Sequence, residues 1–262
     1  CWRGHPRGRS YTRKLTRLIV LGGVDQEQVN LTRFGLFFPE KRDFFLENEG
    51  TFSFQDVSIR NYCTGSSPRS FKLFHSRRIG LSDDREVLPI LGGARLTGRV
   101  GEQLEVGFLN MQTRSVERPA GEPLHPAENF GVARVKTNLP GGSYVGGIFV
   151  NRQATGGTDR EADHNRAWGL DSNLRLFENM VVSTYLARTS DRSGPSGDEG
   201  AAMLQVAWRD PLWDASVLAK HVGDAFNPEV GFVARRGVRR LFGTLGAHPR
   251  VQRAGILEVN PY

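Results

Sequence analysis

The chain has no apolar run long enough to form a membrane-spanning helix. Its 262 residues are 38% hydrophobic with a mean hydropathy of -0.41, and a helix needs roughly 18 to 20 consecutive apolar residues to cross a bilayer. The sequence therefore predicts no membrane-spanning helix in these residues. A β-barrel is not excluded, because only alternate residues of its strands need to be apolar.

Cysteine is also scarce. Cys1 and Cys63 are too few for a disulfide framework or a cysteine-based metal site, and no two of the six histidines stand at a metal-binding spacing. The glycine pairs lack the context of a phosphate-binding loop, and no serine or cysteine lies in a nucleophile elbow. The sequence therefore predicts no cofactor and no metal.

Sorting signals are absent from the residues present. The chain begins with Cys1, shows no basic segment followed by an apolar stretch, and ends at Tyr262 inside a strand-like pattern. We interpret it as a fragment of a longer protein.

Positive charge is in excess, but it is not concentrated in one part of the sequence. The formal net charge is +7 and the sequence pI is about 9.8, with arginines spread along the whole chain. Nucleic-acid binding needs a basic patch on a recognisable module, and no such module is visible. No nucleic-acid partner is predicted, which leaves anionic lipid and anionic solutes as partners.

What the sequence does contain is a regular rhythm from Leu91 onward. Strand-like runs of about ten residues are separated by short connections near residues 101–102, 139–142, 177–179 and 210–211 and by long polar ones at 114–128, 154–165 and 189–200. This pattern predicts an antiparallel meander with all its long loops on one side. It is typical of an outer-membrane β-barrel, and the alternative is a soluble up-and-down barrel or a sandwich.

Alternation within the runs predicts two chemically different faces. In residues 167–176, Trp168, Leu170, Leu174 and Leu176 share one face, whereas Asp171 lies with the polar residues on the other. In a soluble barrel the apolar face would point inward, and in a membrane barrel it would point outward.

Two residue sets favour the membrane orientation. Aromatic residues beside the short turns predict an interfacial girdle of Tyr144, Phe177, Trp208 and Trp213. Charged residues in mid-strand predict a water-filled lumen lined by Arg134, Lys136, Asp171, Arg175, Arg209, Asp214 and Lys220. These cations would favour anionic or polar solutes; the alternative is that Asp171 and Asp214 balance them.

One run departs from this alternation. Residues 143–152 are apolar on both faces. We expect their lumenal side to meet a plug; the alternative is that the strand assignment is wrong there.

The chain divides into three parts. Residues 1–23 are basic and irregular, residues 24–90 form a pre-barrel or plug segment, and residues 91–262 form the partial barrel. Within the plug segment, Pro39 predicts the first turn of one short helix that runs through Leu46 and stops at Gly50.

Several segments resemble a family of uncharacterised bacterial proteins. The resemblance runs from Val24 to Phe242 and rests on the segments "QVNLTRFGLFFPEKRDFFLENEGTFSF", "FHSRRIG", "PILGGARLTGRVG", "VGFLNMQT", "NFGVARVKTN" and "FNPEVGFVARRG". Members of this family carry a domain like the family 9 carbohydrate-binding modules, followed by a predicted outer-membrane β-barrel. The resemblance implies location in the bacterial outer membrane and glycans as a partner class. This chain lacks the carbohydrate-binding domain.

A cluster of carboxylates is the strongest candidate for chemistry. Glu40, Asp43, Glu47 and Glu49 lie among aromatic residues, and glycosidases use paired carboxylates. Glu40 and Asp43, three residues apart, could share one helix face. The alternative is that neighbouring cations such as Lys41 and Arg42 neutralise them and stabilise the plug.

His75 is a second candidate functional residue, because Arg77 and Arg78 follow it. These residues either form an anion-contacting constriction or pair with the acidic helix.

We therefore predict an all-β fold, an antiparallel meander forming part of an outer-membrane-type β-barrel, with a short helical segment before it. The predicted function is the binding or passage of glycans or other polar solutes, with the lipid bilayer as a partner. One alternative is a carbohydrate-active hydrolase that uses Glu40, Asp43 or Glu47. The other is a structural or adhesive surface barrel.

Overall fold

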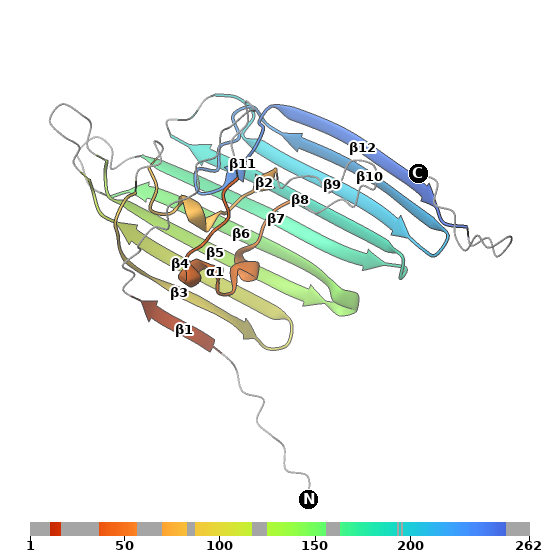
Figure 1. Cartoon of the computed structure of the whole chain (residues 1–262), viewed down its shortest axis with the longest axis horizontal. Helices are drawn as coiled ribbons and strands as arrows, with labels where there is room; N and C mark the ends of the chain where they lie inside the picture. The colour runs from red at the N-terminus through yellow and green to blue at the C-terminus, as the bar shows by residue number, and fades with distance from the viewer. Residues whose placement is uncertain are drawn as a thin grey trace, which may run out of the picture.

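The fold is one large antiparallel sheet with short segments packed on one face (Figure 1). The computed structural model describes residues 11–16, 37–56, 70–82, 87–116, 125–155, 163–192, 194 and 196–249. The strand order is β1-β3-β4-β5-β6-β7-β8-β9-β10-β12, and each strand is antiparallel to its neighbours. The predicted meander is confirmed. The sheet is open in the part of the chain that the structure describes, with β1 and β12 as its edges.

The strands of this sheet are β1 (Tyr11–Thr16), β3 (Ile90–Val100), β4 (Leu104–Thr113), β5 (Glu128–Leu139), β6 (Ser143–Ala154), β7 (His164–Leu176), β8 (Met180–Asp191), β9 (Gly200–Arg209), β10 (Trp213–Val222) and β12 (Val238–Ala247). From β3 onward, the short and long connections alternate where the sequence predicts them. The short turns lie at one end of the sheet and the long connections at the other (Figure 1).

Local turn chemistry explains the short connections. Gly101, Gly141 and Gly142 have positive φ angles, which glycine adopts without a steric penalty. The β7–β8 turn places Phe177 and Glu178 at φ 51° and 58°. These are left-handed conformations, which residues other than Gly, Asn and Asp seldom adopt.

The first part of the chain differs from the prediction in two respects. Tyr11–Thr16, in the segment predicted to be irregular, form β1 and pair with β3. The predicted helix from Pro39 to Gly50 is shorter: α1 is Asp43–Leu46, followed by the 3-10 turn η1 (Glu49–Phe52). Glu40 lies before the helix because its carboxylate accepts hydrogen bonds from the backbone amides of Lys41 and Arg42.

We call residues 37–56 and 70–82 the covering segment. It holds α1, η1, the 3-10 turn η2 (Ser76–Arg78) and the short strand β2 (Phe71–Lys72). β2 pairs with β11 (Phe232–Val233), which lies in the β10–β12 connection. The covering segment and this connection therefore meet on the same side of the sheet.

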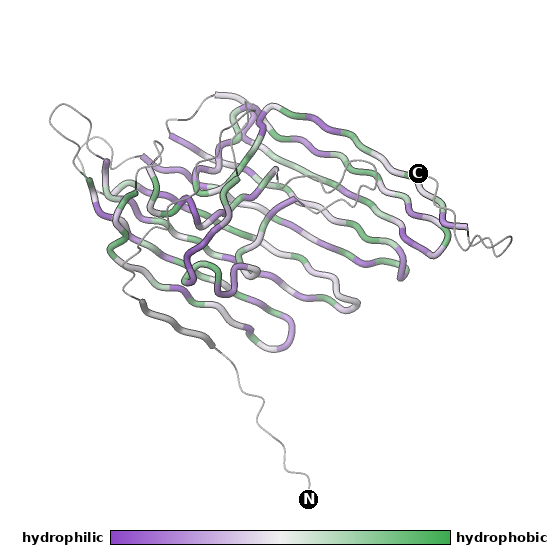
Figure 2. The backbone as a smooth tube through the Cα atoms, viewed as in Figure 1, coloured by the Kyte–Doolittle hydropathy of each residue, from purple (hydrophilic) through white to green (hydrophobic). Residues whose placement is uncertain are grey.

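Aromatic packing joins the covering segment to the sheet. Its buried residues include Phe44, Phe52, Phe54, Phe71 and Leu73, which share a core with strand residues Leu109, Met111, Phe130, Val132, Ile148, Val150, Ala167, Tyr185 and Met203. Figure 2 shows the alternation of hydrophobic and hydrophilic residues along the strands below them.

Glycine on the sheet permits this close packing. A Cβ atom at Gly169 would lie 2.5 Å from the Phe54 ring, so a larger residue in the middle of β7 would displace that ring.

Candidate functional site

The two faces of the sheet differ in chemistry, and we name them by the covering segment. The inner face carries it, and the outer face is the opposite side. On β7, Asn165, Ala167 and Gly169 are buried on the inner face, whereas Trp168 and Leu170 are exposed on the outer one.

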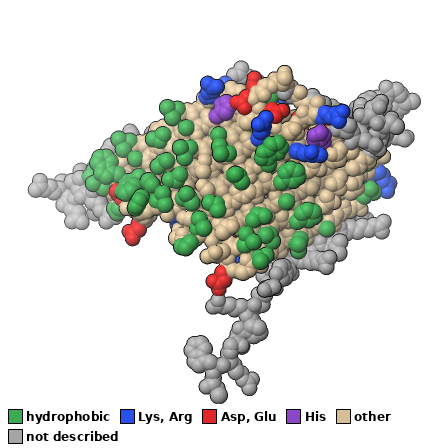
Figure 3. Space-filling view, turned by 180° about the vertical axis from the view of Figure 1, so that it is seen from behind, with side chains coloured by type: hydrophobic (Ala, Val, Ile, Leu, Met, Phe, Trp, Pro, Cys, Tyr) green, Lys and Arg blue, Asp and Glu red, His purple; other side chains and the backbone are tan. Residues whose placement is uncertain are grey.

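The outer face is apolar, although none of the residues that the structure describes covers it. Leu170, Leu241 and Leu245 are 66%, 80% and 65% exposed. Further exposed residues on this face are Leu96, Phe108, Val135, Val145, Phe149, Trp168, Leu186, Leu204, Trp208, Trp213 and Val217. Strand register places these side chains next to one another, because Phe149 is opposite Trp168 and Leu170 is opposite Leu186. Hydrophobic side chains spread over this face in Figure 3.

Three of the four predicted girdle aromatics are exposed near the short-turn end. Phe177, Trp208 and Trp213 are exposed there. Tyr144 is placed wrongly by the sequence analysis, because its side chain lies on the inner face. Its ring is 5.0 Å from the Lys136 ammonium on β5, and alternation puts Tyr144 on the same side as buried Ile148 and Val150.

Those two β6 residues explain why residues 143–152 are apolar on both faces. Ile148 and Val150 belong to the core shared with the covering segment, whereas Val145 and Phe149 lie on the exposed outer face.

On the inner face, Arg134 and Asp171 form a buried pair. Arg134 is 1% exposed, and its Nη1 and Nη2 atoms donate to the two Asp171 carboxylate oxygens at 2.6 and 2.8 Å. The paired geometry compensates for the cost of burying both charges. These two predicted lumenal residues, on β5 and β7, therefore balance each other.

A second pair anchors the covering segment. The Lys220 ammonium donates to both Asp56 carboxylate oxygens, at 2.8 and 2.6 Å, and to the Ser70 hydroxyl at 3.0 Å. The Tyr185 hydroxyl donates to the same Asp56 at 3.0 Å. Asp56 and Ser70 belong to the two halves of the covering segment, so Asp56 is bound to β8 and β10 and Ser70 is bound to β10.

The remaining predicted lumenal residues lie on the inner face nearer the short turns. Lys136 is 3.7 Å from Glu105, and Arg209 is 3.7 Å from Asp214. Arg175 is exposed at the end of β7. Only Arg134, Asp171 and Lys220 of the predicted set form close, buried contacts.

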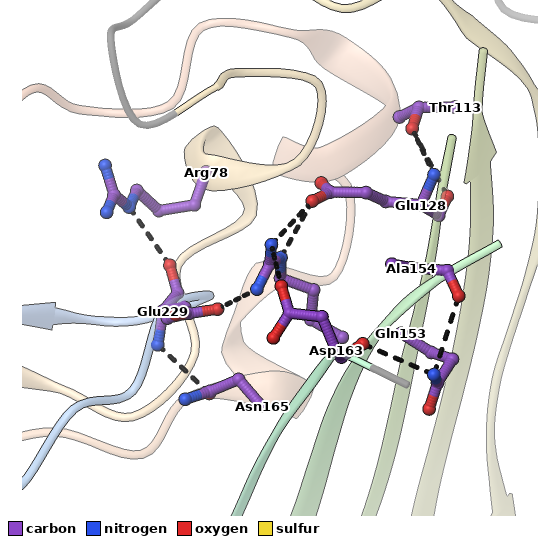
Figure 4. Close-up of polar contacts among 9 residues, drawn as sticks. Arg78, Thr113, Glu128, Gln153, Ala154, Asp163, Asn165 and Glu229 are labelled. Atoms are coloured by element: carbon purple, nitrogen blue, oxygen red, sulfur yellow. Dashed lines mark hydrogen bonds and ion pairs between the residues drawn. The ribbon is translucent and has the colours of Figure 1, made fainter. Parts of the chain in front are cut away.

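The most connected cation on the inner face was not predicted. Arg152 donates from Nε to Glu128 at 2.9 Å, from Nη2 to Asp163 at 3.3 Å, and from Nη1 to Glu229. Figure 4 shows Glu128, Asp163 and Glu229 converging from different segments. These carboxylates and Arg152 are far apart in the sequence, so no local motif could have revealed the cluster.

The cluster also binds the β10–β12 connection to the sheet. The Glu229 carbonyl accepts a hydrogen bond from Arg78 Nε at 3.1 Å, and its amide donates to Asn165 at 3.2 Å (Figure 4). Glu229 therefore links the covering segment, the connection and β7.

The acidic cluster is neutralised rather than assembled into a reactive pair. Glu40, Glu47 and Glu49 form ion pairs with Arg42, Arg95 and Lys72 at 2.7, 2.9 and 2.9 Å. Asp43 is exposed at the start of α1. Glu40 and Asp43 do not share a helix face, because α1 begins only at Asp43.

Glu40 is the most constrained of these carboxylates. Burial raises its pKa, but Arg42, together with the Ser76 hydroxyl at 2.7 Å, outweighs burial and lowers the pKa to about 2. Arg42 also donates to the carbonyls of Ser76 and Ile79 at 2.7 and 2.9 Å. Glu40 is thus an ionised structural group that holds η2 against the start of α1.

His75 does not pair with the acidic residues. Its Nε2 atom lies 2.9 Å from the Phe38 carbonyl, and its ring stacks on Phe37 at 4.9 Å. Burial lowers the His75 pKa to about 4, so the ring is neutral at pH 7 and supplies no cation to a constriction.

Two other features are absent from the described residues. No helix there has the length and hydropathy to span a membrane, and no group of three or more His, Cys, Asp or Glu side chains is arranged to hold a metal ion.

Comparison with protein-family models, curated proteins and solved structures gives no match for this chain.

Proposed function

We propose that this chain is part of an outer-membrane β-barrel whose outer face contacts lipid and whose lumen holds the covering segment as a plug. The observation that carries the proposal is the apolar outer face, exposed at Leu170, Leu241 and Leu245. Soluble antiparallel sheets bury their apolar face and expose the polar one. Here a second apolar face is exposed in addition to the buried one, and a bilayer would stabilise such a face.

The dimensions of the apolar region support a membrane setting. On β7, outer-face apolar residues extend from Trp168 to Leu176. At about 3.3 Å per residue this distance is roughly 26 Å along the strand. A strand tilt of about 40° reduces it to roughly 20 Å, close to the ~25 Å apolar band of such barrels.

The inner face supports a role in binding or passage of polar solutes, glycans included. Lys136, Arg175 and Arg209 lie on this face outside the closely paired buried clusters. Passage would require the covering segment to move, because it occupies the centre of the face and is held by the Asp56–Lys220 ion pair and by the hydrogen bond from Arg78 to the Glu229 carbonyl. That occlusion also supports a second candidate, a structural or adhesive barrel whose long connections bind partners.

Two experiments test these proposals. The full-length protein should fractionate with membranes and migrate differently on a denaturing gel before and after heating; a soluble protein without this difference would contradict the barrel. Conductance in planar bilayers then separates the candidates. An ion current that rises when Lys220→Met releases the covering segment supports passage, and a silent bilayer with both proteins supports the adhesive role.

A further inference from the structure

The outer face changes character toward the long-connection end. Charged and histidine side chains gather along one edge of the hydrophobic face in Figure 3. Toward the long-connection end of β7, the outer-face side chains are Leu170, Trp168 and then Arg166. On β8, Leu186 is followed in the same direction by Arg188. Both arginines therefore lie where the apolar band ends.

Arg166 and Arg188 are close enough to act together. Trp168 is opposite Arg188 and Arg166 is opposite Ser190, so the arginines are diagonal neighbours on one face, about 7 to 8 Å apart. Two guanidinium groups at this spacing can contact one phosphate group.

Both charges are available to a ligand. Arg166 is exposed and donates from Nε to the neutral amide of Asn151 at 3.2 Å, which leaves its other donors without a partner among the described residues. Arg188 lies 3.6 Å from Glu199, but its side chain is 65% exposed. An exposed pair of this kind contributes little and is readily exchanged.

A hollow in the outer face lies on the apolar side of these arginines. Its volume is about 480 Å³, and its lining includes Val135, Val145, Gly147, Leu170 and Leu186. Gly147 has no side chain, so the sheet is indented between these larger residues. From Arg188 to Thr184, which also lines the hollow, the strand covers roughly 13 Å, close to the ~15 Å depth of half the hydrocarbon core.

We propose that this strip of β5–β8 binds one phosphate-bearing anionic lipid, with the phosphate on Arg166 and Arg188 and an acyl chain in the hollow at Gly147. The inference rests on the proposed membrane function, because a lipid ligand must approach through the outer face. The arginines match the phosphate in charge and geometry, and the hollow matches the acyl chain in polarity.

Trp168 reports directly on this strip. The full-length protein, with its other tryptophans changed to Phe, is placed in phosphatidylcholine bilayers that contain a minor fraction of phosphatidylglycerol. Bromine, a contact quencher, is carried by the acyl chains of either one lipid or the other. We expect brominated phosphatidylglycerol to quench Trp168 more than its mole fraction predicts. In Arg166→Gln/Arg188→Gln this preference should fall by roughly fivefold for each arginine removed.

Two comparisons locate the effect. Arg99→Gln/Arg175→Gln removes the same charge at the short-turn end and should leave the preference intact. Gly147→Leu keeps both arginines, fills the hollow and should reduce the preference; no change would overturn the proposed acyl-chain seat. Unchanged heat-dependent migration shows that each variant is folded.

The outcomes separate this inference from the function beneath it. Quenching by brominated phosphatidylglycerol that is no greater than its mole fraction predicts would overturn the lipid site and leave the membrane barrel in place. No quenching by either lipid would contradict the membrane barrel itself.

Discussion

Leu170 and Asp171 are neighbours in sequence and lie in opposite environments. Leu170 is exposed on an apolar face with no cover, whereas Asp171 is paired with a buried arginine beside the covering segment. Because strand side chains alternate, the same contrast extends across the sheet. Buried charge is accommodated where the protein provides partners, and the apolar residues of the outer face are left for another environment to cover. The following changes test that contrast.

The largest effect should come from breaking the inner pair. Arg134→Met leaves the Asp171 carboxylate without its partner, and removing one member of a buried ion pair costs about 3 to 5 kcal/mol. Denaturant titration should show this loss in the free energy of unfolding. Arg134→Met/Asp171→Leu should recover most of it. A loss no larger in the single variant than in the double variant would show that the pair is not needed.

A charge on the outer face should have the next largest effect. Leu170→Arg should cost about 2 to 4 kcal/mol of folding free energy in lipid vesicles, because the residue lies within the apolar band. Leu212→Arg, in the β9–β10 turn, is the control and should cost at most about 1 kcal/mol. If Leu170 faced water, its substitution would stay within about 0.5 kcal/mol.

A smaller effect on stability is expected from two substitutions in the acidic cluster, one at a buried and one at a half-exposed carboxylate. Glu40→Gln removes a buried carboxylate that accepts charged hydrogen bonds from Arg42 and should loosen the covering segment by about 1.5 to 3 kcal/mol. Glu47 is half-exposed, so Glu47→Gln should cost less than about 1 kcal/mol. Hydrogen exchange at the Leu73 amide, which donates to the Phe54 carbonyl at 3.0 Å, measures this attachment. Equal protection in the two variants would contradict the structural role of Glu40.

The same attachment should weaken at acidic pH. His75 and Glu40 both have pKa values lower in the fold than their usual 6.5 and 4.5, about 4 and about 2. In those intervals the unfolded segment binds more protons than the folded one, so stability is lost as pH falls. The His75 contribution is present above pH 6.5 and is lost toward pH 4. The Glu40 contribution is present above pH 4.5 and is lost toward pH 2.

The variant His75→Gln isolates the contribution of His75 to this pH dependence. In His75→Gln, protection of the Leu73 amide, corrected for intrinsic exchange, should become independent of pH between 6.5 and 4.5. An unchanged pH dependence would assign that interval to another group.

The sequence predicted those features that depend on local pattern. The short turns at residues 101–103, 140–142, 177–179 and 210–212 contain residues typical of turns, and period-two alternation identified both faces of β7. The site was less accessible, because its contacts join distant residues. Glu40 binds Ser76 and Asp56 binds Lys220, and neither pair has a local signal.

The errors in the prediction have several causes. The helix predicted to start at Pro39 starts later, because the Glu40 carboxylate accepts hydrogen bonds from the backbone amides of Lys41 and Arg42. Tyr144 resembled a girdle residue by its distance from the turn alone, but strand parity places it beside Lys136. β11, which pairs with β2 across the fold, has no counterpart among the predicted strands.

The most direct test of the account compares adjacent positions on β7 in lipid bilayers. Single spin labels at residues 170, 172 and 173, in a full-length protein with its native cysteines replaced, are probed with oxygen, which enters lipid, and with a water-soluble nickel complex. We predict high oxygen accessibility at 170 and 172 and low oxygen accessibility at 173. Preferential access of the nickel complex to positions 170 and 172 would contradict a lipid-facing outer surface.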